Sequence, residues 1–543
     1  MMTILKLESE ATRGDFAWSL PDTFNFGRDV VDAWARRAPD KLALIWCDES
    51  GNERRFSFSE ISALSNQFAN LLRAQGVQRG DRILVMLPRL PHWQIAMVGC
   101  IKLGAIPIPC IDMLTAKDVA YRVSHAGATG VVTHGENVTK FASTQDFKVC
   151  VAVGGAPGWL DFDHAVAGQS DSFDSVDSQL DDPAIIYYTS GSTGMPKGVT
   201  HAVRALYCWR ISAWYWQGLG KNDLIWCTAD TGWSKAGTSI LFGPWSAGSA
   251  VLFYKGAFDP ATRLALLARY GVTVFCGAAT EFRHIVNECF DSHDLSRLRL
   301  ALSAGEAVNP EVVRRWQAAT AIPLIEAYGQ TETLMTIANS MSNASKPGSM
   351  GLPLPGTHVA ILDDTGAPLP PGEQGQLALR LPNPQLMLGY WNDPDRTAST
   401  RVVHDGVEYF LTGDLAYVDE EGYCFYAGRT DDIISSAGYR IGPMEVENAL
   451  SEHPSVVECA VVGSPDPQRG EIVKAFIVLL GGVPPSEQLV KELQEHVKRT
   501  TAPYKYPRAV EFVDALPKTV SGKILRRVLR DREYASNSQH RPA

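Results

Sequence analysis

The sequence has 543 residues, 45% of them hydrophobic, so the chain is long enough for more than one domain and a large core. Its formal net charge is −10, and no block of like charge stands out, which argues against nucleic acid as a partner. The ten cysteines are irregularly spaced and none forms a CxxC motif, which indicates buried free thiols in a reducing compartment.

The first 16 residues, MMTILKLESEATRGDF, carry acidic residues early and contain no apolar segment of signal-peptide length. They also lack the Arg- and Ser-rich pattern of a mitochondrial presequence. The most apolar stretch, residues 93–110, is interrupted by Lys102 and ends in Gly and Pro. It predicts a buried helix that leads into a strand, not a membrane span. We therefore expect a cytoplasmic protein with no membrane span.

Helical and strand-like stretches alternate through the first 350 residues. Apolar residues recur at helical spacing over residues 59–76, which end in Gly. Short apolar runs bounded by Gly, Pro or polar turns predict buried strands at residues 82–88, 130–134, 184–189, 272–277 and 298–305. Strands that alternate with helices predict α/β layers.

The character of the sequence changes after about residue 350. Residues 351–380 are dense in Pro and Gly and alternate in polarity, as in a small antiparallel sheet. A charged, compact tail with its own helix and strand pattern follows. We predict an α/β protein with a large, multi-layer N-terminal domain at residues 1–430 and a small α+β C-terminal domain at residues 431–543.

A run of Gly and small hydroxyl residues, TSGSTGMPKG, occupies residues 189–198. It follows a predicted strand and precedes a long helical stretch at residues 201–216. A polar surface connector would explain the hydroxyl-rich part alone. In the full run, Gly lets successive N–H groups face one anion, hydroxyls add donors and Lys197 adds a positive charge, which favours a phosphate-binding loop. It is not a Walker A loop, because Gly198 follows Lys197.

Four further motifs follow this run. They are EAYGQTE at residues 326–332, TGD at 412–414, GRTDDIISSAGYRIGP at 428–443 and PKTVSGKILR at 517–526. With these five motifs in order, the chain resembles the ANL superfamily of adenylate-forming enzymes over nearly its whole length, and most closely the medium-chain acyl-CoA synthetases. The resemblance implies a carboxylate–CoA ligase that uses ATP and Mg²⁺, forms an acyl-adenylate, passes the acyl group to coenzyme A, and releases AMP and pyrophosphate.

The motifs suggest four catalytic residues. Attack on the α-phosphate builds negative charge on phosphate oxygens, so the site must supply position and positive potential. Lys523 would bridge the carboxylate and the α-phosphate, and Lys197 and Thr331 would contact phosphate oxygens. Glu332 is a hard oxygen ligand suited to Mg²⁺. Taken singly, a capping Thr, a solvated Glu and a solvated Lys would be the ordinary interpretations.

The nucleotide contacts that the resemblance implies form a larger set. Asp414 would accept hydrogen bonds from the ribose hydroxyls, Arg429 would join it, and the turn at Gly305 and Glu306 would lie along the adenine. The predicted ATP-binding residues are Thr189, Ser190, Gly191, Ser192, Thr193, Gly194, Lys197, Gly305, Glu306, Glu326, Ala327, Tyr328, Gly329, Gln330, Thr331, Asp414, Arg429 and Lys523.

The resemblance also implies that the small domain is mobile and turns between the two half-reactions, with a hinge at Asp431. Gly438 would let the pantetheine arm pass close to the backbone, and Arg440 and Arg469 are candidates for CoA phosphates. The predicted CoA-binding residues are Ala437, Gly438, Tyr439, Arg440, Arg469 and Lys498, with Arg499 as a further candidate. A solvated basic surface is the alternative for the basic members.

The acyl pocket is the least specific prediction, and its candidates are Trp233, Cys276, Gly277, Ala278, Thr280, Gly329 and Leu334. Gly329 would leave room for a longer acid where acetate-specific relatives carry Trp, unless it serves only a bend of the backbone. Medium-chain relatives usually continue TETG, whereas this chain reads TETL. Leu334 would therefore shorten the tunnel or flatten it for an aromatic ring. We expect medium-chain fatty acids, with benzoate-type aryl acids as the alternative.

Other functions share parts of this pattern. An amino-acid-activating domain usually passes its product to a fused carrier domain, for which the chain has no room after Lys523. A luciferase-like oxygenase shares the adenylation chemistry, and a nucleotide-binding sensor lacking turnover would keep the nucleotide site alone. The predicted partners are ATP, coenzyme A and a small carboxylate, with no nucleic acid, and a homodimer stays open.

Overall fold

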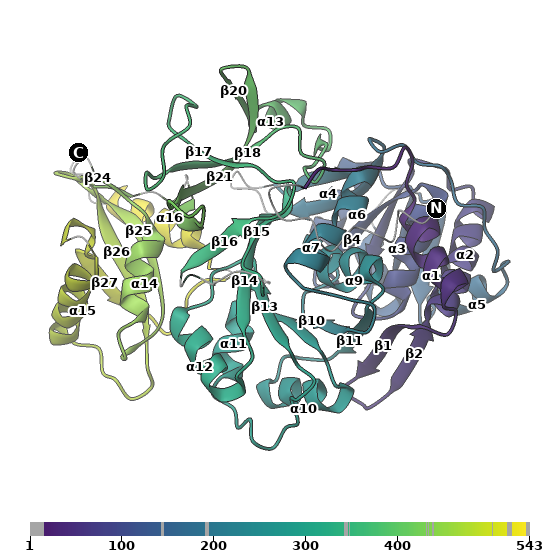
Figure 1. The fold of residues 1–543 in the computed structure, drawn as a ribbon, viewed down its shortest axis with the longest axis horizontal. Coiled ribbons are helices and arrows are strands. Elements are labelled where there is room, and N and C mark those ends of the chain that lie inside the picture. Colours follow the sequence, from purple (N-terminus) through teal and green to yellow (C-terminus); the bar gives the residue numbers. More distant parts are fainter. Residues whose placement is uncertain are drawn as a thin grey trace.

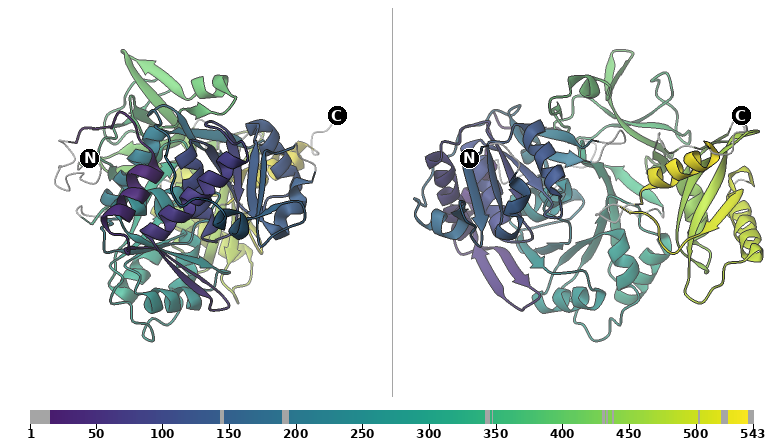
Figure 2. Two further views of the ribbon diagram at one scale, coloured as in Figure 1. Left: turned by 90° about the vertical axis from the view of Figure 1, so that its right-hand side faces the viewer. Right: turned by 180° about the vertical axis from the view of Figure 1, so that it is seen from behind.

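The described residues form four β-sheets (Figure 1). The structure is a computed structural model. It describes residues 16–142, 146–189, 195–341, 346, 348–429, 432, 434–436, 439–501, 503–518 and 524–538. The N-terminal and C-terminal parts lie at opposite ends of the molecule, and Figure 2 shows the same separation from behind.

The first sheet is parallel and has five strands in the order β4-β3-β5-β6-β7. Its strands are β3 (Arg82–Met86), β4 (Ile106–Cys110), β5 (Gly130–His134), β6 (Val149–Val153) and β7 (Leu160–Asp161). Its helices are α2 (Phe58–Ala74), α3 (His92–Leu103), α4 (Ala116–Ala126) and α5 (Phe162–Ala167). The predicted strands at residues 82–88 and 130–134 are confirmed, as are the helix at 59–76 and the helix-to-strand reading of 93–110.

Helix α2 begins where its sequence supplies a cap. The Ser57 hydroxyl accepts a hydrogen bond from the Glu60 N–H, and the Glu60 carboxylate accepts one from the Ser57 N–H. This reciprocal pair satisfies two N–H groups that have no partner within the helix. The helix therefore begins at Phe58, one residue before the predicted start.

The largest sheet has fourteen strands and runs through the middle of the molecule (Figure 1). Its parallel part contains β1 (Leu42–Asp48), β10 (Leu224–Cys227), β11 (Ala250–Lys255), β12 (Val274–Gly277), β13 (Leu300–Ala304) and β14 (Leu324–Gln330), with β2 (Glu53–Ser57) antiparallel at the edge. Its antiparallel part contains β15 (Leu334–Ala338), β16 (Ser349–Pro353), β17 (Val359–Leu362), β18 (Gly375–Arg380), β20 (Arg401–His404), β21 (Val407–Val418) and β22 (Cys424–Arg429). The change from parallel to antiparallel pairing agrees with the predicted change of character near residue 350.

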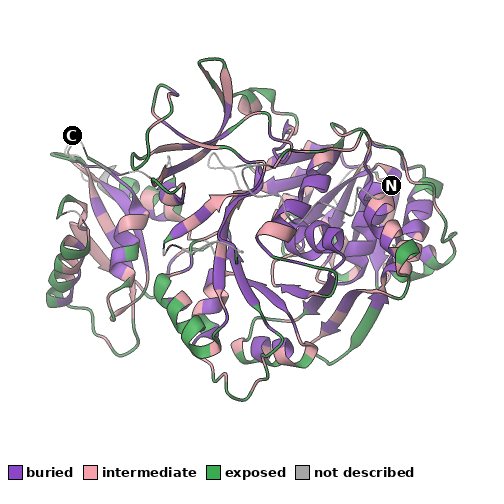
Figure 3. Ribbon diagram, viewed as in Figure 1, coloured by how far each residue is buried: buried purple, intermediate pink, exposed green. Residues whose placement is uncertain are grey.

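Both faces of the parallel part are covered. Helices α10 (Pro260–Tyr270), α11 (Ala279–Ile285) and α12 (Pro310–Thr320) contribute buried apolar residues to the core on one face. Segments that include α7 (Arg210–Tyr215) and α9 (Phe242–Ala247) supply the core on the other face. Figure 3 shows buried strands between them, with exposed residues on the outer sides of helices such as α12. This burial on both faces explains the continuous apolar runs in the sequence.

A small antiparallel sheet carries the glycine-rich run. It consists of β8 (Pro183–Thr189), β9 (Lys197–Ala202) and β19 (Gly389–Tyr390). The expected strand-to-helix context is wrong, because residues 197–202 form a strand that pairs with β8. The helical stretch expected at residues 201–216 is confirmed over most of its length, but as two short helices, α6 (Val203–Cys208) and α7, rather than one.

The C-terminal sheet contains β23 (Ile434–Ser436), β24 (Tyr439–Ile441), β25 (Val456–Asp466), β26 (Gly470–Leu479) and β27 (Ala509–Phe512). Helices α14 (Pro443–Ser451), α15 (Glu487–Thr500) and α16 (Arg526–Ser538) accompany it, and α14 and α15 supply much of its apolar core. The predicted α/β fold with a small α+β C-terminal domain is confirmed. The boundary and hinge at Asp431 stay predictions, because this residue lies outside the described residues.

All ten cysteines are free thiols, and eight of them are buried. Within the described residues, none of the helices has the length and apolar character needed to cross a membrane.

Candidate active site

Lys197, Glu332 and Tyr390 form the first cluster of the site. Lys197 opens β9, and its Nζ lies 3.3 Å from Glu332 Oε1 and 3.0 Å from the Tyr390 hydroxyl. The same hydroxyl donates to Glu332 Oε1 over 3.0 Å, and the Lys197 ammonium lies 4.6 Å from the Tyr390 ring centroid. Burial and the nearby Glu332 charge raise the pKa of Tyr390, so its hydroxyl stays a neutral donor.

Thr331 precedes Glu332 and is fixed through its main chain. The Thr331 carbonyl accepts a hydrogen bond from His201 Nε2 over 2.6 Å, and the Thr331 hydroxyl lies 3.2 Å from the Ser234 hydroxyl. Burial lowers the pKa of His201 to about 4, so its ring is neutral at pH 7 and Nε2 carries the proton. Thr189 ends β8 and is the strand partner of Lys197. Five predicted phosphate-loop residues, Ser190 to Gly194, lie outside the described residues.

The donor set fits a Mg²⁺ ion that substrate phosphates complete. Mg²⁺ is usually held by one or two carboxylates together with water and phosphate oxygens. Glu332 offers one carboxylate, whose side chain is 12% exposed. In the part of the chain that the structure describes, no group of three or more His, Cys, Asp or Glu side chains could hold a metal alone. The site therefore suits a metal that arrives with ATP.

Asp414 is the centre of a second cluster. It lies in β21, is 3% exposed, and its Oδ2 accepts hydrogen bonds from the Tyr328 hydroxyl (2.5 Å) and Gln330 Nε2 (2.6 Å). Arg429 is its cross-strand partner, with Nη1 3.3 Å from Asp414 Oδ1. The pKa of Tyr328 is raised first by burial and then by the Asp414 charge, so the phenol keeps its proton. Strands β14, β21 and β22 thus bring four predicted ATP-binding residues together.

Glu326 lies in β14, and Gly305 and Glu306 directly follow the neighbouring strand β13. Glu326 Oε1 accepts a hydrogen bond from the Val308 N–H over 2.6 Å, and burial raises the pKa of this carboxyl to about 7. Gly305 follows β13 with φ of +100°, a conformation that favours Gly. Glu306 Oε1 accepts a hydrogen bond from the Thr280 N–H over 3.2 Å. Ala327 is buried in β14 beside these residues.

The acyl-pocket candidates Cys276, Gly277, Ala278 and Thr280 occupy the end of β12 and the start of α11. Trp233 lies just before the helix α8 (Ser234–Ala236). Lys235, which the sequence analysis did not single out, donates from Nζ to the main-chain oxygens of Gly277 (3.4 Å) and Ala304 (3.1 Å). It therefore connects the ends of β12 and β13. Lys235 lies two residues after the pocket candidate Trp233, but nothing local in the sequence indicated where its side chain would reach.

Gly329 lies against the main chain of Leu334 where β14 pairs with β15. A Cβ atom on Gly329 would lie 2.0 Å from the Leu334 carbonyl oxygen, so the close approach of two backbones accounts for this Gly. Leu334 is 2% exposed and adopts φ of +57°, which is uncommon for a residue other than Gly. The structure thus supports the backbone alternative for Gly329, and Leu334 occupies a conformation suited to the Gly of TETG.

The predicted CoA residues do not join these clusters. Tyr439 is 52% exposed and stacks on Tyr504 at 4.4 Å, and its strand β24 lies at the outer edge of the C-terminal sheet (Figure 1). Arg469 is exposed, and Lys498 pairs with Glu495 over 2.6 Å. Arg440 belongs to β24, but its side chain is not described. Asp431, Ala437, Gly438 and Lys523 lie outside the described residues.

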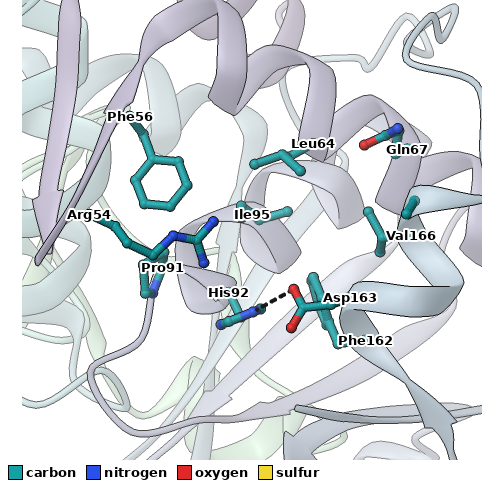
Figure 4. A pocket seen from close by; sticks show the side chains of 11 residues that line it. Arg54, Phe56, Leu64, Gln67, Pro91, His92, Ile95, Phe162, Asp163 and Val166 are labelled. Carbon is teal, nitrogen blue, oxygen red and sulfur yellow. Dashed lines mark hydrogen bonds and ion pairs between the residues drawn. The ribbon is translucent and has the colours of Figure 1, made fainter. Parts of the chain in front are cut away.

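Two cavities among the described residues lie in different places, and one of them adjoins the first cluster. One of about 220 Å³ adjoins Lys197 and Tyr390, on the side where His125 and Arg396 lie. The other, of about 180 Å³, is shown in Figure 4 between β2, α2, α3 and α5, and His92 Nε2 lies 3.1 Å from Asp163 Oδ1 at its rim. Its walls contain none of the predicted site residues, so the second cavity is separate from the candidate active site.

Comparison with known proteins decides the family. The profile of the AMP-binding enzyme family matches residues 31–391, and that of the AMP-binding enzyme C-terminal domain matches residues 445–523. The chain belongs to the AMP-binding enzyme family. It is therefore an ATP-dependent, AMP-forming acid–thiol ligase that makes acyl-CoA through an acyl-adenylate, with Mg²⁺ as cofactor and CoA as co-substrate. The resemblance drawn from the five motifs is confirmed at this level.

Three relatives illustrate the match. The mouse (Mus musculus) protein "Acyl-coenzyme A synthetase ACSM3, mitochondrial" is 43% identical over 97% of this chain and 93% of its own. The crystal structure of the anthranilate CoA ligase AuaEII with anthranoyl-AMP is 30% identical, with a TM-score of 0.87 over 97% of this chain and 100% of that one. The Brucella canis acyl-CoA synthetase is 34% identical, with a TM-score of 0.72 over 96% of both chains.

These relatives correct the predicted location. The mouse protein and its rat and human counterparts are named as mitochondrial, so the prediction of a cytoplasmic protein is wrong. That prediction rested on free cysteines and on a missing presequence pattern. Free thiols are compatible with more than one reducing compartment, and a missing pattern names no compartment.

Proposed function

We propose that the two clusters hold the parts of one ATP molecule. Lys197 and Thr331 contact phosphate oxygens beside the loop at residues 189–194, and Glu332 is the carboxylate that receives Mg²⁺. Asp414 accepts hydrogen bonds from the ribose hydroxyls, with Arg429 next to it. Lys523 neutralises charge between the carboxylate and the α-phosphate. Bound Mg²⁺ neutralises phosphate charge and orients the leaving pyrophosphate.

One observation carries this assignment. Lys197 and Glu332 are far apart in the sequence, yet their charged atoms lie 3.3 Å apart, one residue from Thr331. Asp414 likewise receives hydrogen bonds from Tyr328 and Gln330, which belong to the same strand that leads to Thr331. A cation, a hydroxyl and a carboxylate at one end, with a carboxylate acceptor at the other, complement a phosphate chain and a ribose.

For the acid, we propose medium-chain fatty acids. The mouse relative is named as an acyl-coenzyme A synthetase and matches this chain over nearly its whole length. The candidate pocket residues Cys276, Gly277 and Leu334 are buried and apolar, which suits an alkyl chain.

Aryl acids are the second candidate, because of Leu334. Its side chain is buried where relatives are expected to carry Gly, and a branched side chain there narrows the space available to a flexible chain. The anthranilate CoA ligase, which acts on an aryl acid, has the same fold at a TM-score of 0.87. A flat ring is the shape that such a narrowed slot would favour.

We further propose that residues 431–543 form the unit that moves, with Asp431 as its hinge. In a second arrangement, CoA would contact Ala437, Gly438, Tyr439, Arg440, Arg469 and Lys498.

The homodimer also stays a prediction, and light scattering after size-exclusion chromatography would test it.

A competition assay tests the proposed function. The protein, ATP and Mg²⁺ are mixed with pooled straight-chain and aryl carboxylates, with and without CoA, and the products are identified by mass spectrometry. CoA thioesters of mid-length fatty acids support the main proposal. Aryl thioesters favour the second candidate and assign specificity to Leu334, which Leu334→Gly should then relax. Nucleotide binding with no adenylate would instead indicate a sensor without turnover.

A further inference from the structure

Glu458 joins the C-terminal domain to the N-terminal part of the chain. It lies in β25, and its Oε1 accepts a hydrogen bond from Arg283 Nη1 over 3.0 Å. The same oxygen lies 2.8 Å from Lys518 Nζ. The Glu458 side chain is 11% exposed, whereas those of Arg283 and Lys518 are 30% and 35% exposed. One largely buried carboxylate is thus shared by two cations from different parts of the chain.

Each of the two cations lies close in the sequence to residues for which a function is proposed. Arg283 belongs to α11, which follows the acyl-pocket candidates Cys276 to Ala278 directly. Lys518 pairs with Ile524 in an isolated antiparallel bridge, so the two residues hold together the ends of the segment that contains Lys523. Glu458 therefore connects the base of the Lys523 segment to the helix that borders the candidate acyl site.

The opposite edge of the C-terminal sheet carries two of the predicted CoA residues, Tyr439 and Arg440. Strand β24, with Tyr439 and Arg440, lies at the outer edge of the molecule, while β25 and the Arg283 contact lie toward α11 (Figure 1). The sheet cannot present both sides to the N-terminal site at once. The observed arrangement therefore presents the Lys518 side.

A second contact lies closer to the proposed hinge, where α14 packs against β22. A turn about that region would move distant points of the C-terminal domain most. The Arg283–Glu458 pair is such a point, and it must break for the domain to turn. Removing one partner would leave the Glu458 carboxylate with less compensation in a poorly solvated position.

We propose that Arg283, Glu458 and Lys518 form a latch that holds the C-terminal domain in the arrangement for adenylate formation. The three are positioning residues, since they touch each other rather than the proposed ATP contacts. The proposal rests on the proposed role of Lys523. Loss of the latch should slow adenylate formation and leave thioester formation intact.

The test separates the half-reactions in Arg283→Met, Glu458→Gln and the double variant. Adenylate formation is measured by ATP–pyrophosphate exchange, and thioester formation by adding CoA to supplied acyl-adenylate. We expect each single variant to lower exchange about tenfold, and the double variant to be no worse than the stronger single one, because the residues share one interaction. The thioester rate should stay within about twofold of the parent or rise, since no CoA contact is removed.

Arg314→Met is the matched control, because Arg314 pairs with Glu311 on the exposed side of α12 and should change neither rate. Thermal unfolding is followed for every variant. If Glu458→Gln is unstable, Arg283→Met still tests the latch, because it changes a side chain that is 30% exposed. Equal loss of both half-reactions, unchanged exchange, or additive effects in the double variant would overturn the latch. Lys523→Ala is run alongside, and undiminished exchange in that variant would overturn the proposed function instead.

Discussion

The nucleotide clusters and the C-terminal attachment are built differently. Asp414 has two side-chain donors within 2.6 Å, and Glu332 has Lys197 and Tyr390 within 3.3 Å, all from N-terminal sheets. The C-terminal domain meets α11 through Glu458, whose cation partners are about one-third exposed. The first region is preorganised by several partly buried hydrogen bonds, whereas the second rests on a few contacts that can be exchanged.

This difference teaches how one chain can serve two reactions. A site that must bind the same nucleotide throughout gains from rigid, satisfied polar groups. A domain that must present one side and then the other gains from contacts that are specific but weak enough to break. Substitutions in either region should abolish the contribution of that region or show how far the two regions act independently.

Lys523→Ala should have the largest effect. Loss of a cation at the reacting phosphate is expected to lower ATP–pyrophosphate exchange by about 10²- to 10³-fold. Thioester formation from supplied acyl-adenylate should be spared, because the α-phosphate chemistry is already complete. Equal loss of both rates would contradict the assignment of Lys523 to the first half-reaction.

Glu332→Gln should follow, with about a 100-fold loss of exchange. The amide keeps the size of the side chain and its hydrogen bond from Tyr390, but it no longer offers a charged ligand to Mg²⁺. Titration with Mg²⁺ at saturating ATP should show a higher concentration for half-maximal rate. An unchanged Mg²⁺ dependence would argue that the metal binds elsewhere.

Tyr390→Phe should cost about tenfold in kcat/KM for ATP, the scale of one hydrogen bond to a charged group. The ring under the Lys197 ammonium is retained, so only the hydroxyl that joins Lys197 to Glu332 is lost. Steady-state kinetics should place the change mainly in the KM for MgATP. A loss confined to the thioester step would be incompatible with this position.

The smallest expected effect concerns Glu326 and the pH dependence of the protein's stability. Its folded-state pKa of about 7 exceeds its ordinary value of 4.5, so the folded protein retains a proton that the unfolded chain releases between these pH values. The contribution to stability is complete below pH 4.5 and is lost as the pH rises through 7, by about 3 kcal/mol in total.

Glu326→Gln removes this titration and can still accept the Val308 N–H. In urea unfolding followed from pH 5 to 7.5, stability of the parent should therefore fall relative to the variant. Parallel curves would mean that Glu326 does not titrate in this range.

Local patterns predicted many of the elements well. The strand at residues 130–134 has the predicted ends, because a short β-branched run between Gly and a polar residue leaves little choice of boundary. The helical stretch expected at residues 201–216 begins at Val203 instead, because residues 197–202 pair with β8 and β19, and tertiary pairing overrode local helical spacing there.

Sequence motifs predicted the site residues that lie within them, whereas residues that distant segments contribute to the site were missed. Lys197, Glu332 and Asp414 were found through short motifs. Tyr390 lies 193 residues from Lys197 in the sequence, and the Glu458 partners come from α11 and from the segment before Lys523. No local pattern reports such contacts, because they depend on which sheet edges the fold brings together.

The most direct test of the account measures ATP binding rather than turnover. Isothermal titration calorimetry of MgATP should give dissociation constants within about twofold for the parent and Arg283→Met, because Arg283 contacts Glu458 and none of the proposed nucleotide contacts. Asp414→Asn should weaken binding in the same experiment. Unchanged binding in Asp414→Asn, or loss of binding in Arg283→Met, would contradict the central claim that the clusters around Asp414 and Glu332 hold the nucleotide independently of the latch.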